Sequence, residues 1–544
     1  MPFPLAMNFI FISTRTFIRR IQSFILHNLP FYVLLFQPNS SSLSSRVYVA
    51  HSDMKLSSYT LLGLTSIATS HPTLSAHPPL PYQGGDACCS SLECKQNALA
   101  FAFTYGFPLY SSSLLAASVP AEAPTNLLLH QRTLLSTRDH AVNRPNADTL
   151  YSTVFWDLSN VDLEITVPDF DGRFGVWPWY DLYGNNFANI GDVTNFTSGK
   201  YLVRYDQKHV GVGTGDSCGS NYTGCISSPT PYGINIIRVV TDNTTSDLAI
   251  VHAIQDKMSI NAIPRKHPSG IPSFDLGIYK AHSMAVGNGT TLPESVLHLT
   301  AALASYNLPG VATDRDWVNK TLTNAGIKDG IWTQPAGTNL TAAVASANAS
   351  VEAFLKAPGN VHTLSNDWTI HDPSTVGDFH SNYIARFYVA TWAYVILTSD
   401  QAVYPSYDSI SSVAADKAIL LTFSGRPLLK KEGFWSLTAY GADEYFIPND
   451  QGRYTLGDRS NLTFPDGSLV YSNSGEDNED GPFQLLLQPA DVKPPANWTS
   501  NWLPAPSGGG DLQFTLRWYG AEAAMSEVEG YKYPKVEVID AIKA

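Results

Sequence analysis

The chain has 544 residues, of which 44% are hydrophobic and only 15% are charged, with a formal net charge of −13. This length supplies enough material for two or three domains, because single hydrophobic cores stop growing at about 250–300 residues. The negative charge and the lack of a Lys- and Arg-rich cluster exclude a nucleic-acid partner, since phosphate binding needs concentrated positive charge.

The N-terminal region contains two candidate export segments. Residues 1–53 hold basic residues and then an apolar run that a proline interrupts, and that run is shorter than the ~20 residues of a membrane span. From Met54, a lysine followed by an apolar stretch has the layout of a signal peptide. We expect residues 1–53 to be a mis-assigned extension, residues 54–76 a signal peptide, and the protein to be secreted. The alternative is a signal anchor at residues 9–36.

Asn-x-Ser/Thr sequons also favour export, because they recur throughout the expected mature chain. A single sequon is weak evidence of glycosylation, but a series after a signal-like segment is stronger. The predicted glycosylation sites are Asn195, Asn221, Asn243, Asn288, Asn319, Asn339, Asn348, Asn461 and Asn497. Glycans cannot pack into a core, so these segments should lie on the surface.

The five cysteines fit an oxidising compartment. Cys218 and Cys225 are spaced to close a small loop, which would contribute about 2.5 kcal/mol in the chain-entropy model. Cys94 has two candidate partners, Cys88 and Cys89, and the alternative is that all five thiols are free. The spacings do not suit a zinc site, so we expect no bound metal.

Helix and strand signals divide the chain into three regions. Strands are predicted within 150–156, 163–167, 174–177 and 234–240; helices within 95–118, 293–306, 338–356 and 376–397; and strands again within 418–423, 434–440, 467–471 and 512–519. We predict an α+β fold class, with an N-terminal β-rich α+β domain at 95–290, a helical connector at 291–400 and a jelly-roll-like antiparallel β-sandwich at 401–544. The apolar run 384–397 is too short to cross a bilayer, so no membrane span is expected.

Several segments carry a family resemblance. They are Asn143–Leu158, Val167–Asp169, Gly172–Phe174, Asp181–Ala188, Arg238, Val251–Asp256, Gly377–Arg386, Ala402–Pro405, Gly433–Tyr440, Arg453–Arg459 and Asn501–Pro506. In this order, from about residue 95 to 540, the chain resembles a tandem family of bacteria and fungi, domain of unknown function 1254 followed by domain of unknown function 1214. The resemblance implies the three regions above and no particular reaction. The cysteine insert near 218–225 and the sequons depart from it and suit a secreted fungal branch.

The richest polar motif lies at the start of the first predicted strand. Asp148 and Tyr151 are candidate catalytic residues, and Asn146 is a candidate substrate-binding residue. A buried aspartate acts as a general base when desolvation raises its pKa. The alternative is an Asx-type turn in which Asn146 and Asp148 bond backbone amides.

An aromatic and polar group begins at the end of the third predicted strand and continues beyond it. Its candidate substrate-binding residues are Trp177, Trp179, Asp181, Tyr183 and Asn186. Ring faces flanked by an amide and a carboxylate suit a sugar or a flat ring. The alternative is that these rings belong to the hydrophobic core.

The last predicted helix begins with a third polar group. His380, Tyr383 and Arg386 are three residues apart and should share one side of the helix. Arg386 and Tyr383 are candidate substrate-binding residues, with Arg386 holding an anion, and His380 is a candidate proton-transfer residue. The alternative is an ion pair of Arg386 with Asp378 or Asp181.

Two further motifs favour structural roles. Arg453, Asp458 and Arg459 read as an ion-pair network in glycine-rich turns. The Gly215–Gly219 segment matches the Gly-x-Ser-x-Gly pattern of hydrolases but lacks the preceding strand and following helix that a nucleophile elbow needs. The chain has no Rossmann, Walker or His-Glu-x-x-His motif, so no cofactor is expected.

Three functions fit these observations. The preferred one is a cofactor-independent extracellular hydrolase, lyase or isomerase acting on a small polar or aromatic molecule. The second is a non-catalytic extracellular glycan- or small-molecule-binding protein, and the third is an interaction scaffold. The expected partners are a small molecule or a glycan, with a homodimer left open. A single site requires Asp148 or Tyr151 to meet Arg386 or His380 beside one of the predicted aromatic residues.

Overall fold

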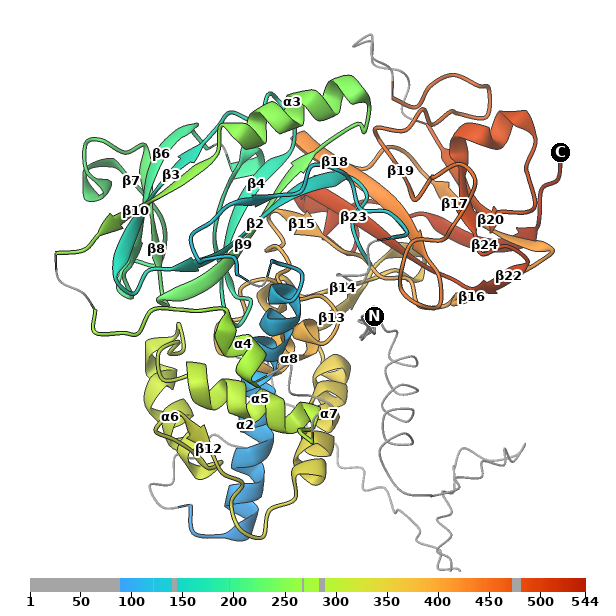
Figure 1. The fold of residues 1–544 in the computed structure, drawn as a ribbon. Helices are drawn as coiled ribbons and strands as arrows, with labels where there is room; N and C mark the ends of the chain where they lie inside the picture. Colours follow the sequence, from blue (N-terminus) through green and yellow to red (C-terminus); the bar gives the residue numbers. More distant parts are fainter. Residues whose placement is uncertain are drawn as a thin grey trace, which may run out of the picture. The chain divides into compact units, whose positions relative to one another are not determined.

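Figure 1 shows the computed structural model, which describes residues 89–120, 122–138, 144–194, 196–266, 269–282, 289–471 and 481–544. The expected segments 1–53 and 54–76 lie outside these residues, as do Cys88, Asn195 and Asn288. Helices and sheets both occur, and no sheet of the described ranges closes into a barrel. The chain therefore has an α+β fold.

Two sheets occupy the first family-like region. One contains, in spatial order, β1 (Leu129–His130), β2 (Thr149–Asp157), β9 (Tyr232–Val240), β4 (Gly175–Asp181) and β5 (Asn186–Gly191). The other contains β10 (Ser259–Pro264), β3 (Val161–Val167), β6 (Gly199–Tyr205), β8 (Gly224–Ser228) and β7 (Gly211–Thr214). Apolar residues from both sheets and from α3 (Thr245–Asp256) form one core.

Alternation along the strands decides which residues reach this core. In β2, Leu150 and Val154 are buried in it, so Tyr151 lies on the opposite face of the same sheet. Tyr151 pairs with Arg238 in the antiparallel register of β2 and β9. Tyr151 and Arg238 therefore lie together on the face of the sheet away from this core.

The helices form a separate group around α2, drawn in blue in Figure 1. Its members are α2 (Leu92–Ala116), α4 (Gly277–His282), α5 (Leu292–Leu303), α6 (Arg315–Asn324), α7 (Leu340–Lys356) and α8 (Tyr383–Ala390). Two short hairpins accompany them, β11 (Ile327–Lys328) with β12 (Ile331–Trp332), and β13 (Val361–Thr363) with β14 (Thr369–His371). Because α2 contacts α5, α6, α7 and α8, the first helix packs with helices of the expected connector.

The expected helix at 376–397 is much shorter in the structure. Gly377 and His380 have positive φ angles of 80° and 47°, which an α-helix cannot contain. The helix α8 begins only at Tyr383, where the side chain of Asn382 caps it by accepting from the amide of Ala385 at 3.1 Å. Hydropathy predicted the apolar segment but not the positive φ angles that prevent a helix at its start.

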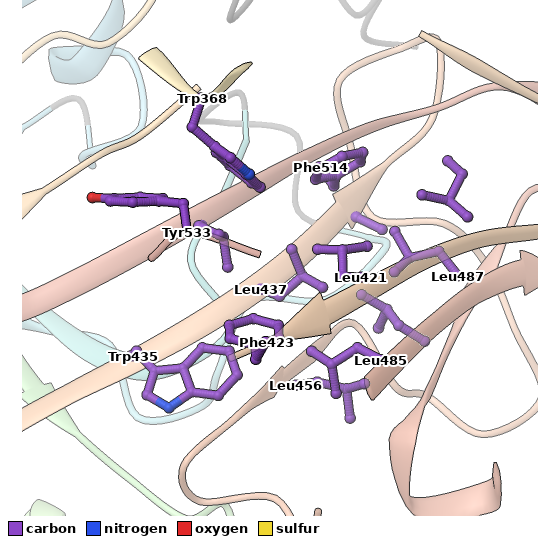
Figure 2. Close-up of a cluster of buried hydrophobic side chains, with 14 of the residues drawn as sticks. Trp368, Leu421, Phe423, Trp435, Leu437, Leu456, Leu485, Leu487, Phe514 and Tyr533 are labelled. Atoms are coloured by element: carbon purple, nitrogen blue, oxygen red, sulfur yellow. The ribbon is translucent and has the colours of Figure 1, made fainter. Parts of the chain in front are cut away.

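The C-terminal region contains two further sheets that share a core. One contains β15 (Ala402–Val403), β23 (Gln513–Ala521), β18 (Leu429–Tyr440) and β19 (Thr455–Gly457). The other contains β21 (Trp502–Ala505), β20 (Phe483–Pro489), β17 (Lys417–Phe423) and β24 (Lys535–Asp540). A small pair, β16 (Ser412–Ala414) with β22 (Gly509–Asp511), completes the region. Figure 2 shows Leu421 of β17, Leu437 of β18 and Leu487 of β20 meeting in this core.

Two details of this region differ from expectation. β20 and β21 run parallel, so the sheet is mixed rather than wholly antiparallel. Residues 467–471 form no strand, because Leu469 makes only an isolated bridge with Thr463. The jelly-roll arrangement stays a prediction.

The disulfides are partly as expected. Cys218 and Cys225 are bonded, with Cα atoms 5.2 Å apart, which confirms the predicted pair. Cys94 is bonded to Cys89, with Cα atoms 5.6 Å apart. Among the described residues, no helix combines the length and the apolar character needed to cross a bilayer, and no group of His, Cys, Asp and Glu is arranged to hold a metal.

Candidate functional site

Some of the predicted site residues lie in two buried polar clusters. The others lie in the hydrophobic core, in a sheet or at the surface. Trp177 and Trp179 are fully buried in the core between the first two sheets, with rings parallel and centroids 6.4 Å apart. Their placement favours the core interpretation. His380 lies at the surface, its side chain 70% exposed, and pairs with Asp378 at 3.6 Å. Asn186 donates to the carbonyls of Trp179 and Ala188, both at 3.2 Å, and so serves the sheet.

Asn146 forms the Asx-type turn that the sequence analysis offered as its alternative. Its Oδ1 accepts from the amides of Asp148 at 2.5 Å and Thr149 at 3.1 Å. Its Nδ2 donates to the hydroxyl of Tyr519 at 2.8 Å. Asn146 therefore holds the start of β2 and also links it to the C-terminal region.

Asp148 is 2% exposed, and only one of its two carboxylate oxygens accepts a hydrogen bond. Its Oδ1 accepts from Arg459 Nη2 at 2.7 Å and from Thr455 Oγ1 at 3.3 Å. Its Oδ2 is buried and has no hydrogen-bond partner. A carboxylate held through one oxygen presents the other as an acceptor for a proton or a polar ligand.

Arg459 belongs to an ion-pair network, as the sequence analysis favoured. It also pairs with Asp458 at 3.0 Å, and its guanidinium lies 4.4 Å from the centroid of the Phe434 ring. Burial raises the pKa of Asp458 to about 6, with Arg459 opposing the rise. Arg453 differs, because it donates to backbone carbonyls, one of them that of Trp502 at 3.0 Å.

Arg238 is 8% exposed and has no carboxylate partner among the residues the structure describes. It donates to the Tyr180 hydroxyl at 3.4 Å and to the backbone carbonyls of Ile236 and Val395, both at 3.2 Å. Burial opposes its charge, but its pKa is raised on balance because tyrosine hydroxyls lie close to it. These tyrosines are Tyr151, Tyr180, Tyr404 and Tyr519.

Arg517 is a second buried arginine of the same kind, 4% exposed. It donates to Thr438 Oγ1 at 3.0 Å, to the carbonyl of Arg144 at 3.1 Å and to the hydroxyl of Tyr440 at 2.8 Å. No carboxylate in the described ranges hydrogen-bonds to it, although the charge of Asp148 raises its pKa from nearby. Tyr519 and Asp148 act on it electrostatically, so it belongs to the same neighbourhood as Arg238.

We call this group the interdomain cluster. Its members are Asn146, Asp148, Tyr151, Tyr180, Arg238, Tyr404, Arg459, Arg517 and Tyr519. Tyr151, Tyr404 and Arg459 are partly exposed and the other members are buried, so solvent reaches the cluster at these three residues. Arg517 was not among the residues predicted for the site, and Arg238 was predicted only as part of the family resemblance. A signal was present, because each is a lone charge in a strand of apolar and aromatic residues.

The second cluster surrounds Arg386, which is 2% exposed. Its guanidinium lies 4.7 Å from the ring centroid of Tyr105, 4.4 Å from that of Tyr183 and 4.8 Å from that of Tyr383. We call these four residues the Arg386 cage. Among the described residues, Arg386 makes no hydrogen bond or ion pair with Asp148 or Tyr151, so one site made from both predicted groups stays a prediction.

Each of the two family-like regions matches a known protein family. Residues 125–262 match the family described as Protein of unknown function (DUF1254), and residues 402–523 match Protein of unknown function (DUF1214). The predicted tandem order is confirmed. The interdomain cluster draws on both segments, for instance Arg238 from the first and Arg517 from the second. No curated protein matches the chain.

Two solved structures are similar to the chain. A crystal structure of a Vibrio parahaemolyticus protein aligns over 82% of this chain and 100% of that one, with 18% identity and a TM-score of 0.54. A crystal structure of an uncharacterized protein from Burkholderia cenocepacia covers 81% of this chain and 89% of that one, with 11% identity and a TM-score of 0.38. The first likeness shows a shared fold and nothing about activity.

Proposed function

We propose that the chain is a cofactor-independent enzyme that acts on a small organic anion bound by the interdomain cluster. The observation that carries this proposal is that Arg238 and Arg517 are both buried and that, among the described residues, neither donates a hydrogen bond to a carboxylate. A buried charge without an ion-pair partner is unfavourable by several kcal/mol. Asp148 acts on Arg517 from nearby but is already bonded to Arg459, so a further counter-charge is expected. A bound anion supplies it.

The donors around these arginines favour a carboxylate or a phosphate group. Guanidinium forks match the planar or tetrahedral oxygens of such groups. Burial raises the pKa of Tyr180 to about 12, so its hydroxyl stays protonated and can donate. Access would run past the partly exposed Tyr151 and Tyr404.

Asp148 supports the catalytic part of the proposal. Its open Oδ2 lies within electrostatic range of Arg517, so an anion held there would approach a general base. Proton transfer through Asp148 or Tyr151 serves hydrolysis, elimination or isomerisation without a cofactor. His380 drops out of this proposal because its side chain is exposed and pairs with Asp378.

A non-catalytic binding protein is the second candidate. Buried Trp177 and Trp179 provide no ring platform for a glycan, so a small anion is the better ligand on this reading too. The two candidates differ only in whether the bound anion is converted.

The test pairs aromatic anions with neutral molecules that carry the same ring. Calorimetry on the full chain with benzoate and phenyl phosphate, against benzamide and phenol, should detect binding of at least one anion and of neither neutral probe. Arg238→Met and Arg517→Met should each weaken that binding at least tenfold. Arg265→Met, which breaks an ion pair with Asp162 elsewhere, should not. Equal binding of the neutral analogues, or no loss in both cluster variants, would contradict the proposal.

Turnover is tested separately on a mixture of carboxylic and phosphate esters followed by mass spectrometry. Asp148→Asn should retain anion binding and lose conversion. Binding by the wild type without conversion of any ester would remove the catalytic part and leave the binding protein.

We also propose that the protein is exported and glycosylated. Two disulfides support this, because they persist in oxidising compartments. Among the described sequons, Asn348 is partly exposed and the others are exposed, namely Asn221, Asn243, Asn319, Asn339, Asn461 and Asn497. Protein secreted from a fungal host should lose mass on treatment with an N-glycosidase and begin near His71 or His77. A mature chain that retains residues 1–53 would contradict the leader assignment. Fungal origin itself stays a prediction.

A further inference from the structure

One arginine of the interdomain cluster is shared by two carboxylates. Arg459 donates from Nη2 to Asp148 Oδ1 at 2.7 Å and from Nη1 to Asp458 Oδ1 at 3.0 Å. We propose that Asp458 is a positioning residue that regulates the candidate base Asp148 through Arg459, so that the site works when Asp458 is ionised and weakens when it is protonated. This inference rests on the proposed function, because it names the regulation of the same site.

The contacts of Asp148 make it depend on Arg459. Asp148 lies just before β2, whereas Asp458 and Arg459 follow β19 in the second family-matched segment. Its Oδ1 accepts from Arg459 and from Thr455 Oγ1, and its buried Oδ2 accepts no hydrogen bond. Among the described residues, Arg459 is the one cation that forms an ion pair with Asp148. The guanidinium that stabilises this carboxylate is therefore one that Asp458 also binds.

The position of Arg459 is fixed from several sides. Its guanidinium lies 4.4 Å from the centroid of the Phe434 ring, and the two carboxylates each bind a different nitrogen. A third carboxylate, Asp242, lies 4.0 Å from Nε, but its side chain is 58% exposed, so solvent screens that interaction. A change of charge on Asp458 can therefore act on Asp148 through Arg459 without movement of the arginine.

Asp458 is placed to change its charge near neutral pH. Burial raises its pKa to about 6; Arg459 and the Trp435 amide oppose the rise, and the negative charge of Asp148 adds to it. The Asp458 side chain is 20% exposed, so a proton from solvent reaches it. The charged groups that face the Asp458–Arg459 pair are Asp148, at the start of β2, and Asp242, before α3.

The direction of the effect follows from these charges. When Asp458 is ionised, two carboxylates share one arginine, and their mutual repulsion favours uptake of a proton by Asp148 Oδ2. When Asp458 is neutral, the charge of Arg459 stabilises the Asp148 carboxylate alone, which then accepts a proton less readily. Asp148 should therefore serve as a general base above about pH 6 and serve less well below it.

The first measurement follows the carboxyl groups and needs no substrate. The full chain, labelled with carbon-13 at its aspartate carboxyls, is titrated by NMR, and Asp458→Asn and Asp148→Asn identify the two signals. In the wild type both signals should shift with a midpoint near pH 6. Asp458→Asn should abolish that step at the Asp148 signal, and Asp242→Asn, the matched control, should retain it. An Asp148 signal without this step, or a step that persists in Asp458→Asn, would overturn the inference whatever the anion-binding test shows.

The second measurement is the pH profile of any ester conversion that Asp148→Asn abolishes. In the wild type, kcat/KM should fall as pH decreases through about 6. Asp458→Asn should remove this step and lower kcat several-fold at higher pH with little change in KM, since Asp458 does not hold the anion. Asp242→Asn should match the wild type. An unchanged profile in Asp458→Asn would contradict the inference, whereas a coupled NMR step without any conversion would refute the enzyme and retain the coupling.

Discussion

Arg144 shows what a single buried charge requires in this protein. Its φ angle is 44°, a conformation that few side chains adopt, and its Nε meets Glu444 Oε2 at 2.5 Å. Burial lowers the pKa of Arg144 to about 10 against the opposing effect of Glu444, so it remains charged at neutral pH. The side chains of the pair are 4% and 1% exposed. Solvent therefore cannot replace either partner.

Glu444→Gln should consequently destabilise the protein strongly. Removing one partner of a buried ion pair leaves the other charge uncompensated, and such changes reduce stability by about 3–5 kcal/mol. Urea unfolding monitored by tryptophan fluorescence measures the difference.

An exposed ion pair provides the control for Glu444→Gln. Lys200 and Glu164 meet at 2.8 Å, and the lysine side chain is 56% exposed. Surface pairs contribute about 0–1 kcal/mol, so Glu164→Gln should change stability little. Equal effects of the two variants would show that the Arg144 pair is solvated in solution.

The residue types in the sequence predicted which chemical groups the candidate site contains better than they predicted where each side chain lies. Asn146 was expected either in a site or in a turn, and it takes part in a turn and in the interdomain cluster at once. Trp177 and Trp179 have the composition of a binding platform, yet their place in the sheet buries them. Whether a ring faces a core or a ligand depends on the partner sheet, which local sequence does not specify.

At the scale of elements, strands and helices were largely predictable because periodicity is local. β2, β3, β9 and the helices α5 and α7 fall where alternation and capping signals indicate. The β2–β9 pairing that sets Tyr151 against Arg238 was not predictable, since register between distant strands leaves no local pattern. The cluster around Arg238 therefore became visible only with the sheet.

The 3-10 helix η1 (Asp192–Thr194) predicts a pH effect on stability. Burial raises the pKa of Asp192 to about 7, aided by the negative charges of Glu432 on β18 and of Asp169. An acid whose pKa is higher in the folded state favours folding when protonated. Its contribution is present below about pH 4, declines as pH rises, and is lost above about pH 7.

Asp192→Asn should therefore be more stable than the wild type at pH 8 and lose that advantage at pH 4. One pKa unit corresponds to about 1.4 kcal/mol, and allowing for the partial exposure of Asp192 we expect about 1–2 kcal/mol. Thermal melts across this pH range measure it. Asp329→Asn, in an exposed turn, is the control. A gap between Asp192→Asn and wild type that is constant with pH would exclude the effect.

The hairpin of β7 and β8 carries the Cys218–Cys225 bond. Closing a loop this short stabilises the fold by about 2.5 kcal/mol through the unfolded state. The double variant Cys218→Ala with Cys225→Ala should lose that amount in guanidinium unfolding. An unchanged midpoint would show that the bond does not restrict the unfolded chain enough to change stability.

For the whole molecule, the contacts that matter most join residues hundreds of positions apart. Arg144 and Glu444 are separated by 300 residues, Asp148 and Arg459 by 311, and Asn146 and Tyr519 by 373. Each bond connects residues just before β2 to the C-terminal region, two of them to turns after β18 and β19 and one to β23. The sequence predicted the two family-like regions. It did not predict that buried polar groups of one region find their hydrogen-bond and ion-pair partners in the other.

This mutual completion predicts one cooperative unfolding transition for the two family-matched segments. Separating them would expose or leave unpaired Arg144, Asp148 and Arg459 together, and each unpaired buried charge is unfavourable by several kcal/mol. Differential scanning calorimetry of the full chain should therefore show these segments melting in a single peak, whose calorimetric and van't Hoff enthalpies agree. Glu444→Gln and Asp148→Asn should lower the temperature of that peak without dividing it. A second, independent peak in the wild type would mean that each region is stable alone, and the interdomain cluster would then be a contact between independently folded domains.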